Sequence, residues 1–189
     1  MYLINKILLI LIIIVSCKPI EKLQTVEIDN SRLDVISLNA KDLLVDTKYA
    51  SIFSDNNIED KIANPPIEVL KSWISENIKS SGNQNRLVVN IIDASITKEE
   101  IKNEDAKKYE EKTIFLYEIF YLVEYILYDD SGFILANTNV ESFRSTTSQK
   151  YISLNESELI INELIYNSLI DFTKESKSMI NFYMEEYLL

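Results

Sequence analysis

The segment from Thr113 to Tyr128 constrains the fold more than any other part of this sequence. Its odd positions are all apolar or aromatic from residue 115 onward: Phe115, Tyr117, Ile119, Tyr121, Val123, Tyr125 and Leu127. Its even positions include Glu118 and Glu124. A period of two with one wholly apolar face is typical of a β-strand that covers a core. A helix would scatter the two glutamates among residues of low helix propensity, so we predict a long strand.

A partner strand follows this segment directly. Asp129-Asp130-Ser131-Gly132 has the composition of a hairpin turn, with Gly132 available for positive φ. The range from Phe133 to Ser145 then returns as the second strand. Its even positions are small enough for a helix to approach closely: Ile134, Ala136, Thr138 and Val140. The other face of the hairpin should meet water or a partner, and it bears Glu118, Glu124, Asn137, Asn139 and Glu141.

A long helix is predicted at the C-terminal end. Ser153 with Glu156, and Asn155 with Glu158, form two overlapping capping boxes. We expect the helix to continue to about Tyr187. Its apolar stripe follows steps of four and seven residues, with two serines on the same face: Ile161, Ile165, Ser168, Phe172, Ser176, Met179 and Tyr183.

The first half of the chain contains a shorter helix and several short strands. Pro65-Pro66 begins the helix, because proline fits the first helical turn. Trp73 lies at the edge of its stripe, and Gly82 is a candidate left-handed cap. The stripe itself is Ile67, Leu70, Ile74 and Ile78. Residues 33–38 and 86–96 read as strands, 43–45 continue the first strand or add an edge, and 98–112 form a solvated loop or a strand extension.

The lengths of the two longest elements suggest how they pack. A helix of about 32 residues spans roughly 48 Å, and a strand of about 16 residues spans roughly 53 Å. A long helix lying along a long hairpin is therefore the economical arrangement. With the order β-α-β-β-β-α, we predict an α+β two-layer sandwich, in which two helices cover one face of an antiparallel or mixed sheet.

Composition excludes several classes of function. The chain of 189 residues has no His, one Cys and two Gly, and its formal charge is −11. Without His, neither His catalysis nor a His metal site is available. One Cys allows no internal disulfide, and two Gly allow no glycine-rich phosphate loop. The acidic balance argues against nucleic acid as a partner. We therefore predict no cofactor and no metal.

The N-terminal residues predict a lipid anchor. Lys6 is followed by an apolar run of nine residues, Ile7 to Val15. A transmembrane helix needs about 20, whereas about 7–15 suit the core of a signal peptide. The run ends in Ile14-Val15-Ser16-Cys17, which resembles a bacterial lipobox, so we expect cleavage before Cys17 and its acylation, for example by palmitate. The alternative is an ordinary signal peptide or an uncleaved anchor with a chance cysteine.

This interpretation sets the predicted organisation of the chain. Residues 1–16 are the lipoprotein signal peptide, 17–31 the lipidated tether and 32–189 a single α+β periplasmic domain. Lipoproteins of this class stay in the inner membrane mainly when Asp follows the cysteine. Lys18 stands there instead, which indicates the inner face of the outer membrane.

Three blocks of residues carry a family resemblance. They are Ala63-Asn64-Pro65-Pro66 with Trp73 and Gly82, then Val89-x-Ile91-x-Asp93-Ala94-Ser95, and then Asp130-Ser131-Gly132 with Arg144-Ser145. Together they resemble the domain of uncharacterised alphaproteobacterial periplasmic lipoproteins. The element order is also similar to the lipopolysaccharide-assembly lipoprotein and to auxiliary lipoproteins of lipid-transporting ABC systems, a likeness at the level of fold. The resemblance implies a fold and a location, and no known activity.

Several polar residues are candidate site residues. Glu118, Glu124 and Glu141 share one sheet face and could serve acid–base chemistry or Ca²⁺ binding, although a solvated face of an acidic protein is the simpler interpretation. Asp93 is either a functional acid or the end of a strand. Arg144 is either an anion site or a surface cation.

The row of Tyr117, Tyr121 and Tyr125 leaves two functions open. The tyrosines could line a groove for a lipid or another apolar ligand, or they could form core beneath the long helix. We predict a non-enzymatic, lipid-anchored protein that acts by protein–protein interaction in cell-envelope assembly or maintenance. The alternative is a carrier that holds an apolar ligand between the tyrosine-rich sheet and the long helix. A Ser–Lys hydrolase is disfavoured, because no Ser-x-x-Lys lies in an apolar setting.

Overall fold

The computed structural model describes residues 29–51 and 54–189. The predicted signal peptide, the lipobox Ile14–Cys17 and most of the tether lie outside the described residues. The folded part includes Asn30, whose side-chain amide donates to the Ser72 hydroxyl at 3.1 Å. No helix among the described residues is long and apolar enough to cross a membrane.

The main sheet is mixed and has four strands in the order β2-β4-β5-β6. These strands are β2 (Asp42–Thr47), β4 (Arg86–Lys102), β5 (Thr113–Tyr128) and β6 (Ile134–Gln149). β2 runs parallel to β4, and the other neighbours are antiparallel. A second, parallel sheet of two strands joins β1 (Ile36–Leu38) to β3 (Ile78–Ser80). Short 3₁₀ helices complete the fold: η1 (Asn30–Arg32), η2 (Glu59–Lys61) and η3 (Glu185–Tyr187).

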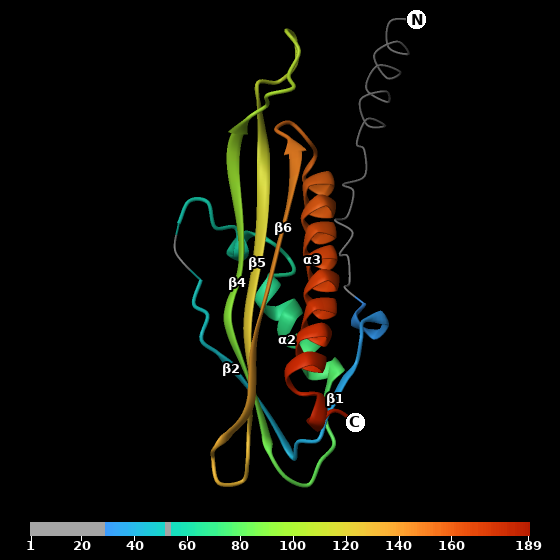
Figure 1. The fold of residues 1–189 in the computed structure, drawn as a ribbon. Coiled ribbons are helices and arrows are strands. Elements are labelled where there is room, and N and C mark those ends of the chain that lie inside the picture. The colour runs from blue at the N-terminus through green and yellow to red at the C-terminus, as the bar shows by residue number, and fades with distance from the viewer. Residues whose placement is uncertain (1–28, 52–53) are drawn as a thin grey trace, which may run out of the picture.

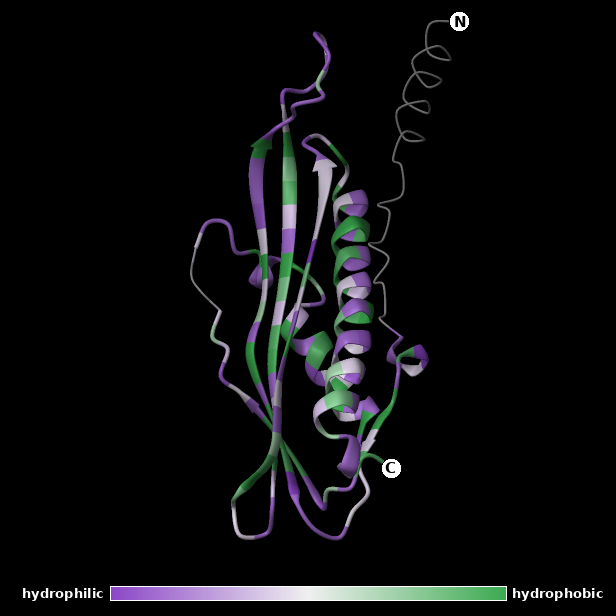
Figure 2. Ribbon diagram, in the orientation of Figure 1, coloured by the Kyte–Doolittle hydropathy of each residue, from purple (hydrophilic) through white to green (hydrophobic). Residues whose placement is uncertain are grey.

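Two α-helices, α2 (Pro66–Asn77) and α3 (Leu154–Tyr183), cover the same face of the main sheet (Figure 1). α3 runs along β6, and its hydrophobic and hydrophilic residues alternate from end to end (Figure 2). This arrangement confirms the predicted α+β two-layer sandwich. β2 is a separate edge strand rather than a continuation of β1, and β4 extends to Lys102 before a loop leads to β5.

The β5–β6 hairpin has the predicted turn. Gly132 has a φ of +86°, and its N–H donates to the Asp129 carbonyl at 3.1 Å. The Asp129 carboxylate also accepts from the backbone N–H of Ser131 at 2.9 Å and of Phe133 at 2.8 Å. Pairing then runs from Tyr128 opposite Ile134 to Ile114 opposite Gln149. A turn stabilised within a few residues explains why local sequence predicted this hairpin.

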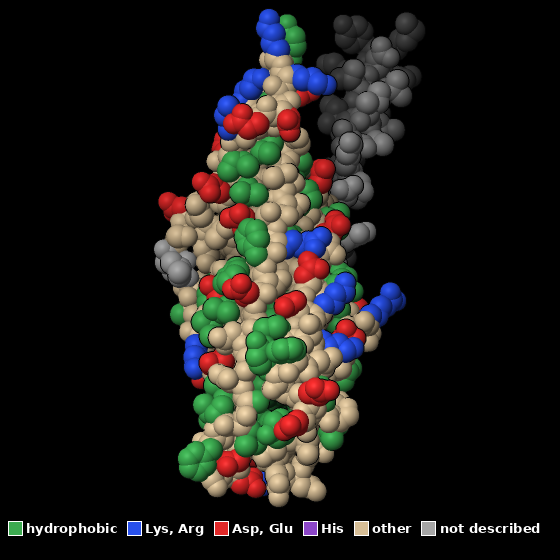
Figure 3. Space-filling model, viewed as in Figure 1, with side chains coloured by type: hydrophobic (Ala, Val, Ile, Leu, Met, Phe, Trp, Pro, Cys, Tyr) green, Lys and Arg blue, Asp and Glu red, His purple; other side chains and the backbone are tan. Residues whose placement is uncertain are grey.

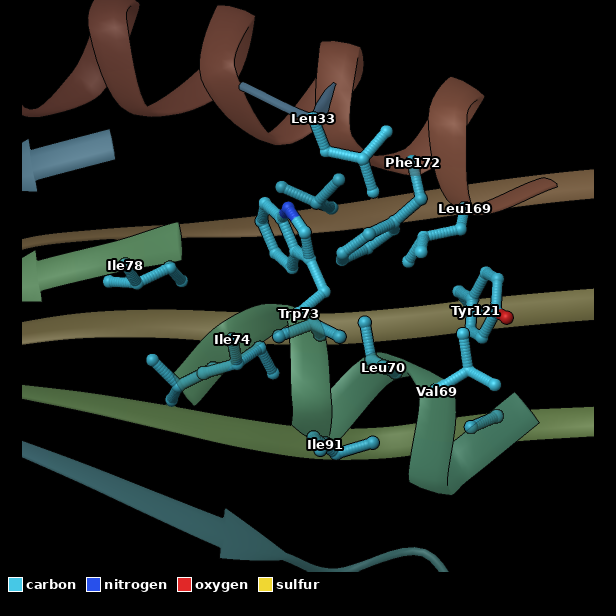
Figure 4. Packing of buried hydrophobic residues seen from close by; sticks show 14 of the residues in the cluster. Leu33, Val69, Leu70, Trp73, Ile74, Ile78, Ile91, Tyr121, Leu169 and Phe172 are labelled. Carbon is cyan, nitrogen blue, oxygen red and sulfur yellow. The ribbon is translucent and has the colours of Figure 1, made fainter. Parts of the chain in front are cut away.

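The core lies between the sheet and the two helices, with Trp73 at its centre (Figure 4). Trp73 is completely buried, and its ring meets Phe172 of α3 edge-on, with centroids 5.8 Å apart. Tyr121 of β5 approaches the same Phe172 ring at 5.5 Å. The prediction that Trp73 lies at the edge of its stripe was wrong. α2 ends at Asn77, so Ile78 belongs to β3, and the buried helix face is centred on Leu70, Trp73 and Ile74.

α3 begins as predicted and ends earlier than expected. The Ser153 hydroxyl accepts from the N–H of Glu156 at 3.1 Å, which is the predicted cap. The helix ends at Tyr183, whose side chain is exposed, and Ile180 is buried instead. The chain turns back there, because the Tyr187 carbonyl accepts from the N–H of Asn39 at 2.7 Å. This tertiary contact, rather than the apolar stripe, sets the end of the helix.

Gly82 does not cap α2, and its role is a close approach between two chain segments. α2 ends at Asn77, and Gly82 follows β3. A Cβ atom at Gly82 would lie 2.3 Å from Oδ1 of Asn39 and 2.7 Å from the backbone N of Ala40. The backbone atom cannot swing aside, so any side chain here would force the two segments apart.

We therefore expect Gly82→Ala to destabilise the protein by about 1–3 kcal/mol through overpacking. Urea unfolding followed by far-UV circular dichroism measures this loss. Ser81→Ala is the matched control, because Ser81 is exposed and such surface changes stay within about 0.5 kcal/mol. Equal stability of the two variants would show that the two segments separate freely.

Candidate functional site

The candidate site is the face of the main sheet on which none of the described helices packs. We call it the open face, and it consists of the even-numbered side chains of β5 and their neighbours in β4 and β6. Its apolar members include Val88, Leu116, Phe120, Leu122, Ile126 and Phe143. Its carboxylates include Glu118, Glu124 and Glu141. Figure 3 shows hydrophobic side chains in patches along the molecule, with acidic side chains between them.

An aromatic pair lies in the middle of this open face. Phe120 of β5 is directly opposite Phe143 of β6 in the strand register, which places such side chains in contact range. Phe143 is 59% exposed, and Phe120 is half-buried. Leu122 extends the patch, opposite Glu141. Exposed aromatic side chains that share one surface are typical of interaction sites.

The sequence-based prediction identified this face but missed its apolar centre. It selected Glu118 and Glu124 as the polar markers of the face. The signal for the rest was present, because β5 is apolar on both faces and a strand with one solvated face should alternate strictly. Phe120 and Leu122 break that alternation.

The three candidate carboxylates on this face do not converge. Glu118 and Glu124 are six residues apart along β5, a separation of about 20 Å in a strand. Glu124 accepts a hydrogen bond from the Asn90 amide at 2.7 Å, and Glu141 lies opposite Leu122. In residues 29–51 and 54–189, no three acidic, Cys or His side chains are grouped closely enough to hold a metal ion.

Asp93 and Arg144 make structural contacts. Asp93 lies at a bulge, where the register between β4 and β5 shifts after Ile91. Its carboxylate accepts from the N–H of Ser95 at 2.9 Å, which stabilises the bulged backbone. Arg144 donates to the Asp171 carboxylate and forms an ion pair that joins β6 to α3.

The tyrosines of the predicted ligand groove are core residues in this structure. Tyr117, Tyr121 and Tyr125 are all completely buried between the sheet and α3. The Tyr125 hydroxyl donates to Ser176 at 3.2 Å, and the Tyr117 hydroxyl lies 3.4 Å from that of Ser157. Burial raises the pKa of Tyr121 and of Tyr125, because a buried phenolate would lose its hydration. A ligand groove here requires α3 to move away from the sheet, and it stays a prediction.

Two of the surface cavities formed by the described residues are relevant here, and the three tyrosines line neither. One, of about 390 Å³, lies between the loop at 61–63 and the first turns of α3. The other, of about 240 Å³, lies beside β6 at the border of the open face. It is lined by Leu122, Asn139, Val140, Glu141, Glu175 and Met179. We call this second hollow the edge cavity.

Comparison with known proteins places the chain in no family. No family model matches it, and no curated protein sequence is significantly similar to it. Similar solved structures include a minor lipoprotein from Acinetobacter baumannii, with a TM-score of 0.39, 12% identity, and coverage of 72% of this chain and 87% of that one. Another is rare lipoprotein B from Shewanella oneidensis, with a TM-score of 0.38, 15% identity, and coverage of 73% and 94%.

These scores are too low to transfer a function or the role of any residue. Both of these solved structures are lipoproteins. The finer expectation, membership of an alphaproteobacterial lipoprotein family, finds no support in these comparisons.

Proposed function

We propose that this protein is a non-enzymatic, lipid-anchored envelope protein that acts by binding another protein through its open face. The observation that carries the proposal is the pairing of Phe120 with the exposed Phe143 on a sheet face that neither α2 nor α3 covers. Aromatic side chains bordered by carboxylates suit a protein partner, because a protein–protein interface combines an apolar centre with a polar rim.

The proposed location rests on the sequence alone. The apolar run from Ile7 to Val15 and the cysteine that ends the lipobox support attachment by acyl chains at Cys17. Lys18 supports the inner face of the outer membrane. From this position, an interaction protein would serve envelope assembly or maintenance, and its partner would be another envelope protein.

Phe120→Ser tests the role of the open face. The full chain is purified from its own envelope with the proteins bound to it, and the amount of each co-purified protein is measured. We expect the bound partner to fall about tenfold, equivalent to about 1.4 kcal/mol, because the change removes half of the central aromatic pair. The free energy of unfolding should change by about as much as it does when other half-buried side chains are truncated.

Phe182→Ser is the matched control for this experiment. Phe182 of α3 is 78% exposed and is no part of the open face, so the same chemical change there should leave the partner bound. An envelope preparation in which the wild-type chain retains no partner would contradict the proposed function. Equal retention by both variants would show that the open face is not the binding surface.

A further inference from the structure

The main sheet has two edge strands, the six-residue β2 and the sixteen-residue β6. β2 pairs with the first part of β4, from Arg86 to Ile91. Backbone hydrogen bonds from the following segment cover more of that edge: Lys48 and Tyr49 to the Ile91 carbonyl at 2.9 and 3.0 Å, Ile58 to Ile96 at 3.3 Å, and Lys98 to Asn56 at 2.8 Å. The Tyr49 hydroxyl donates to the buried carboxylate of Glu59, and this hydrogen bond stabilises the segment that follows β2. On this side β4 is therefore paired or covered from Arg86 to Lys98, and the six-residue β2 is the outer strand.

The same hydrogen bonds reveal which way the backbone of β6 points. The carbonyls of Ile91 and Ile96 point away from β5. Ile91 and Ile96 therefore form non-hydrogen-bonded pairs with Val123 and Ile119 of β5. In such a pair both residues point their N–H and C=O away from each other. Val123 and Ile119 thus point theirs towards β6. These two residues pair with Val140 and Arg144, both even-numbered. The odd-numbered residues of β6 therefore point their N–H and C=O away from β5.

Six residues of β6 consequently present their backbone groups at an open edge. They are Asn137, Asn139, Glu141, Phe143, Ser145 and Thr147, and all six are exposed. Among the residues that the structure describes, the backbone hydrogen bonds of β6 all go to β5. Proteins usually protect such an edge with lysine, proline or a covering segment. β6 has neither lysine nor proline over its length. α3 meets β6 on the face of the even-numbered side chains, as the ion pair between Arg144 and Asp171 shows, so the edge is suited to receive another strand.

The edge cavity indicates the chemistry of that strand. Leu122, Val140 and Met179 provide apolar walls, and Glu141 and Glu175 provide carboxylates. No hydrogen bond or ion pair to either carboxylate occurs among the described residues. Lysine and arginine fit such a hollow, because their stems cover apolar surface while their charged ends meet carboxylates.

We propose that the open edge of β6 binds an extended segment of a partner protein, which adds to the sheet as a fifth strand and places a lysine or arginine in the edge cavity. The inference rests on the proposed function and names the kind of partner segment. Backbone pairing supplies affinity in this mode, and side-chain pockets supply specificity. A basic segment also complements a chain whose formal charge is −11.

A second copy of this chain is a poorer occupant of the edge. The only cation of β6 is Arg144, which already pairs with Asp171 of α3. Two copies joined through β6 would bring Glu141 and Glu175 of each chain to one seam without a free cation from either strand. Like charges at a shared interface oppose association.

Ser145→Pro tests the edge without breaking the sheet. The Ser145 N–H points away from β5, so proline removes a donor that only an added strand would use, and proline is tolerated at such edge positions. In the co-purification experiment described above, we expect at least an about tenfold loss of the bound partner, equivalent to about 1.4 kcal/mol. Ser145→Ala keeps the backbone donor and should retain the partner. Unchanged thermal unfolding of Ser145→Pro verifies that the sheet is intact.

A photo-crosslinking residue at Thr147, in the full chain, identifies what lies at the edge. We expect cross-links to an extended partner segment that contains lysine or arginine, and none after Ser145→Pro. Cross-links to a helix, or to another copy of this chain, would overturn the proposal. If Phe120→Ser releases the partner but Ser145→Pro does not, the proposed function stands and the edge proposal falls. If neither releases the partner, both fall.

Discussion

Replacing Trp73 by alanine should lower the free energy of unfolding by about 3–5 kcal/mol, the range typical of a large buried aromatic side chain. Most single domains are stable by only about 5–15 kcal/mol. A loss of this size would therefore remove a large share of the stability of a typical domain.

The position of Trp73 explains the size of this effect. The side chain comes from α2, is completely buried and packs edge-on against Phe172 of α3. Phe172 in turn contacts Tyr121 of the sheet, so removing the indole opens a cavity where both helices meet β5. The indole Nε1 has no hydrogen-bond partner among the described residues. The loss is therefore expected to come from packing and apolar burial.

Urea unfolding must be followed by far-UV circular dichroism here, because Trp73 is the only tryptophan and the variant has no tryptophan fluorescence. Trp73→Phe is the matched control, since it keeps an aromatic ring and should cost only about 1–2 kcal/mol. A Trp73→Ala variant less than about 1 kcal/mol weaker than wild type would be incompatible with a rigid core at this position.

Replacing Cys17 by alanine should move the protein from the membrane fraction to the soluble fraction. Each buried acyl methylene contributes about 0.8 kcal/mol of membrane affinity, and stable anchoring needs more than one chain. Cys17 is the only cysteine and hence the only thiol available for acylation. Among the described residues, no helix offers another way to span the membrane.

Fractionation of cells grown with labelled palmitate measures both anchoring and acylation. Ser16→Ala is the control, because it keeps a small residue before the cysteine and should leave the protein labelled and membrane-bound. A Cys17→Ala variant that stays in the membrane fraction would favour the alternative of an uncleaved N-terminal anchor. This result would leave the open face and its partner unaffected.

Local sequence patterns predicted the elements whose cause is local. The period of two from Thr113 to Tyr128, the positive φ of Gly132 and the Ser153 cap all depend on residues a few positions apart. The face of β5 that meets the helices was readable for the same reason. The alternative interpretation of Asp93 as a strand end and of Arg144 as a surface cation, without a functional role, also agrees with their contacts.

Features that depend on distant contacts were missed or misplaced. Trp73 lies at the centre of the core because α2 ends at Asn77 and Ile78 belongs to β3. β3 in turn forms by pairing with β1, about forty residues earlier in the chain. Gly82 is required by the backbone of Asn39 and Ala40, more than forty residues away. The aromatic pair of Phe120 and Phe143 depends on the hairpin register, which brings two strands together.

The two-layer α+β architecture, the long hairpin and the capped helix could be predicted from the sequence alone, because periodicity and caps act over short distances. The anchor at Cys17 stays a prediction. Only the tertiary structure decided which surfaces remain available. β2 and the segment after it pair with β4 from Arg86 to Lys98, whereas no backbone hydrogen bond from the described residues reaches β6 on the side away from β5, beside the edge cavity. Hydrogen-bond direction in a sheet depends on how all strands pair together, and no single segment of sequence contains that information.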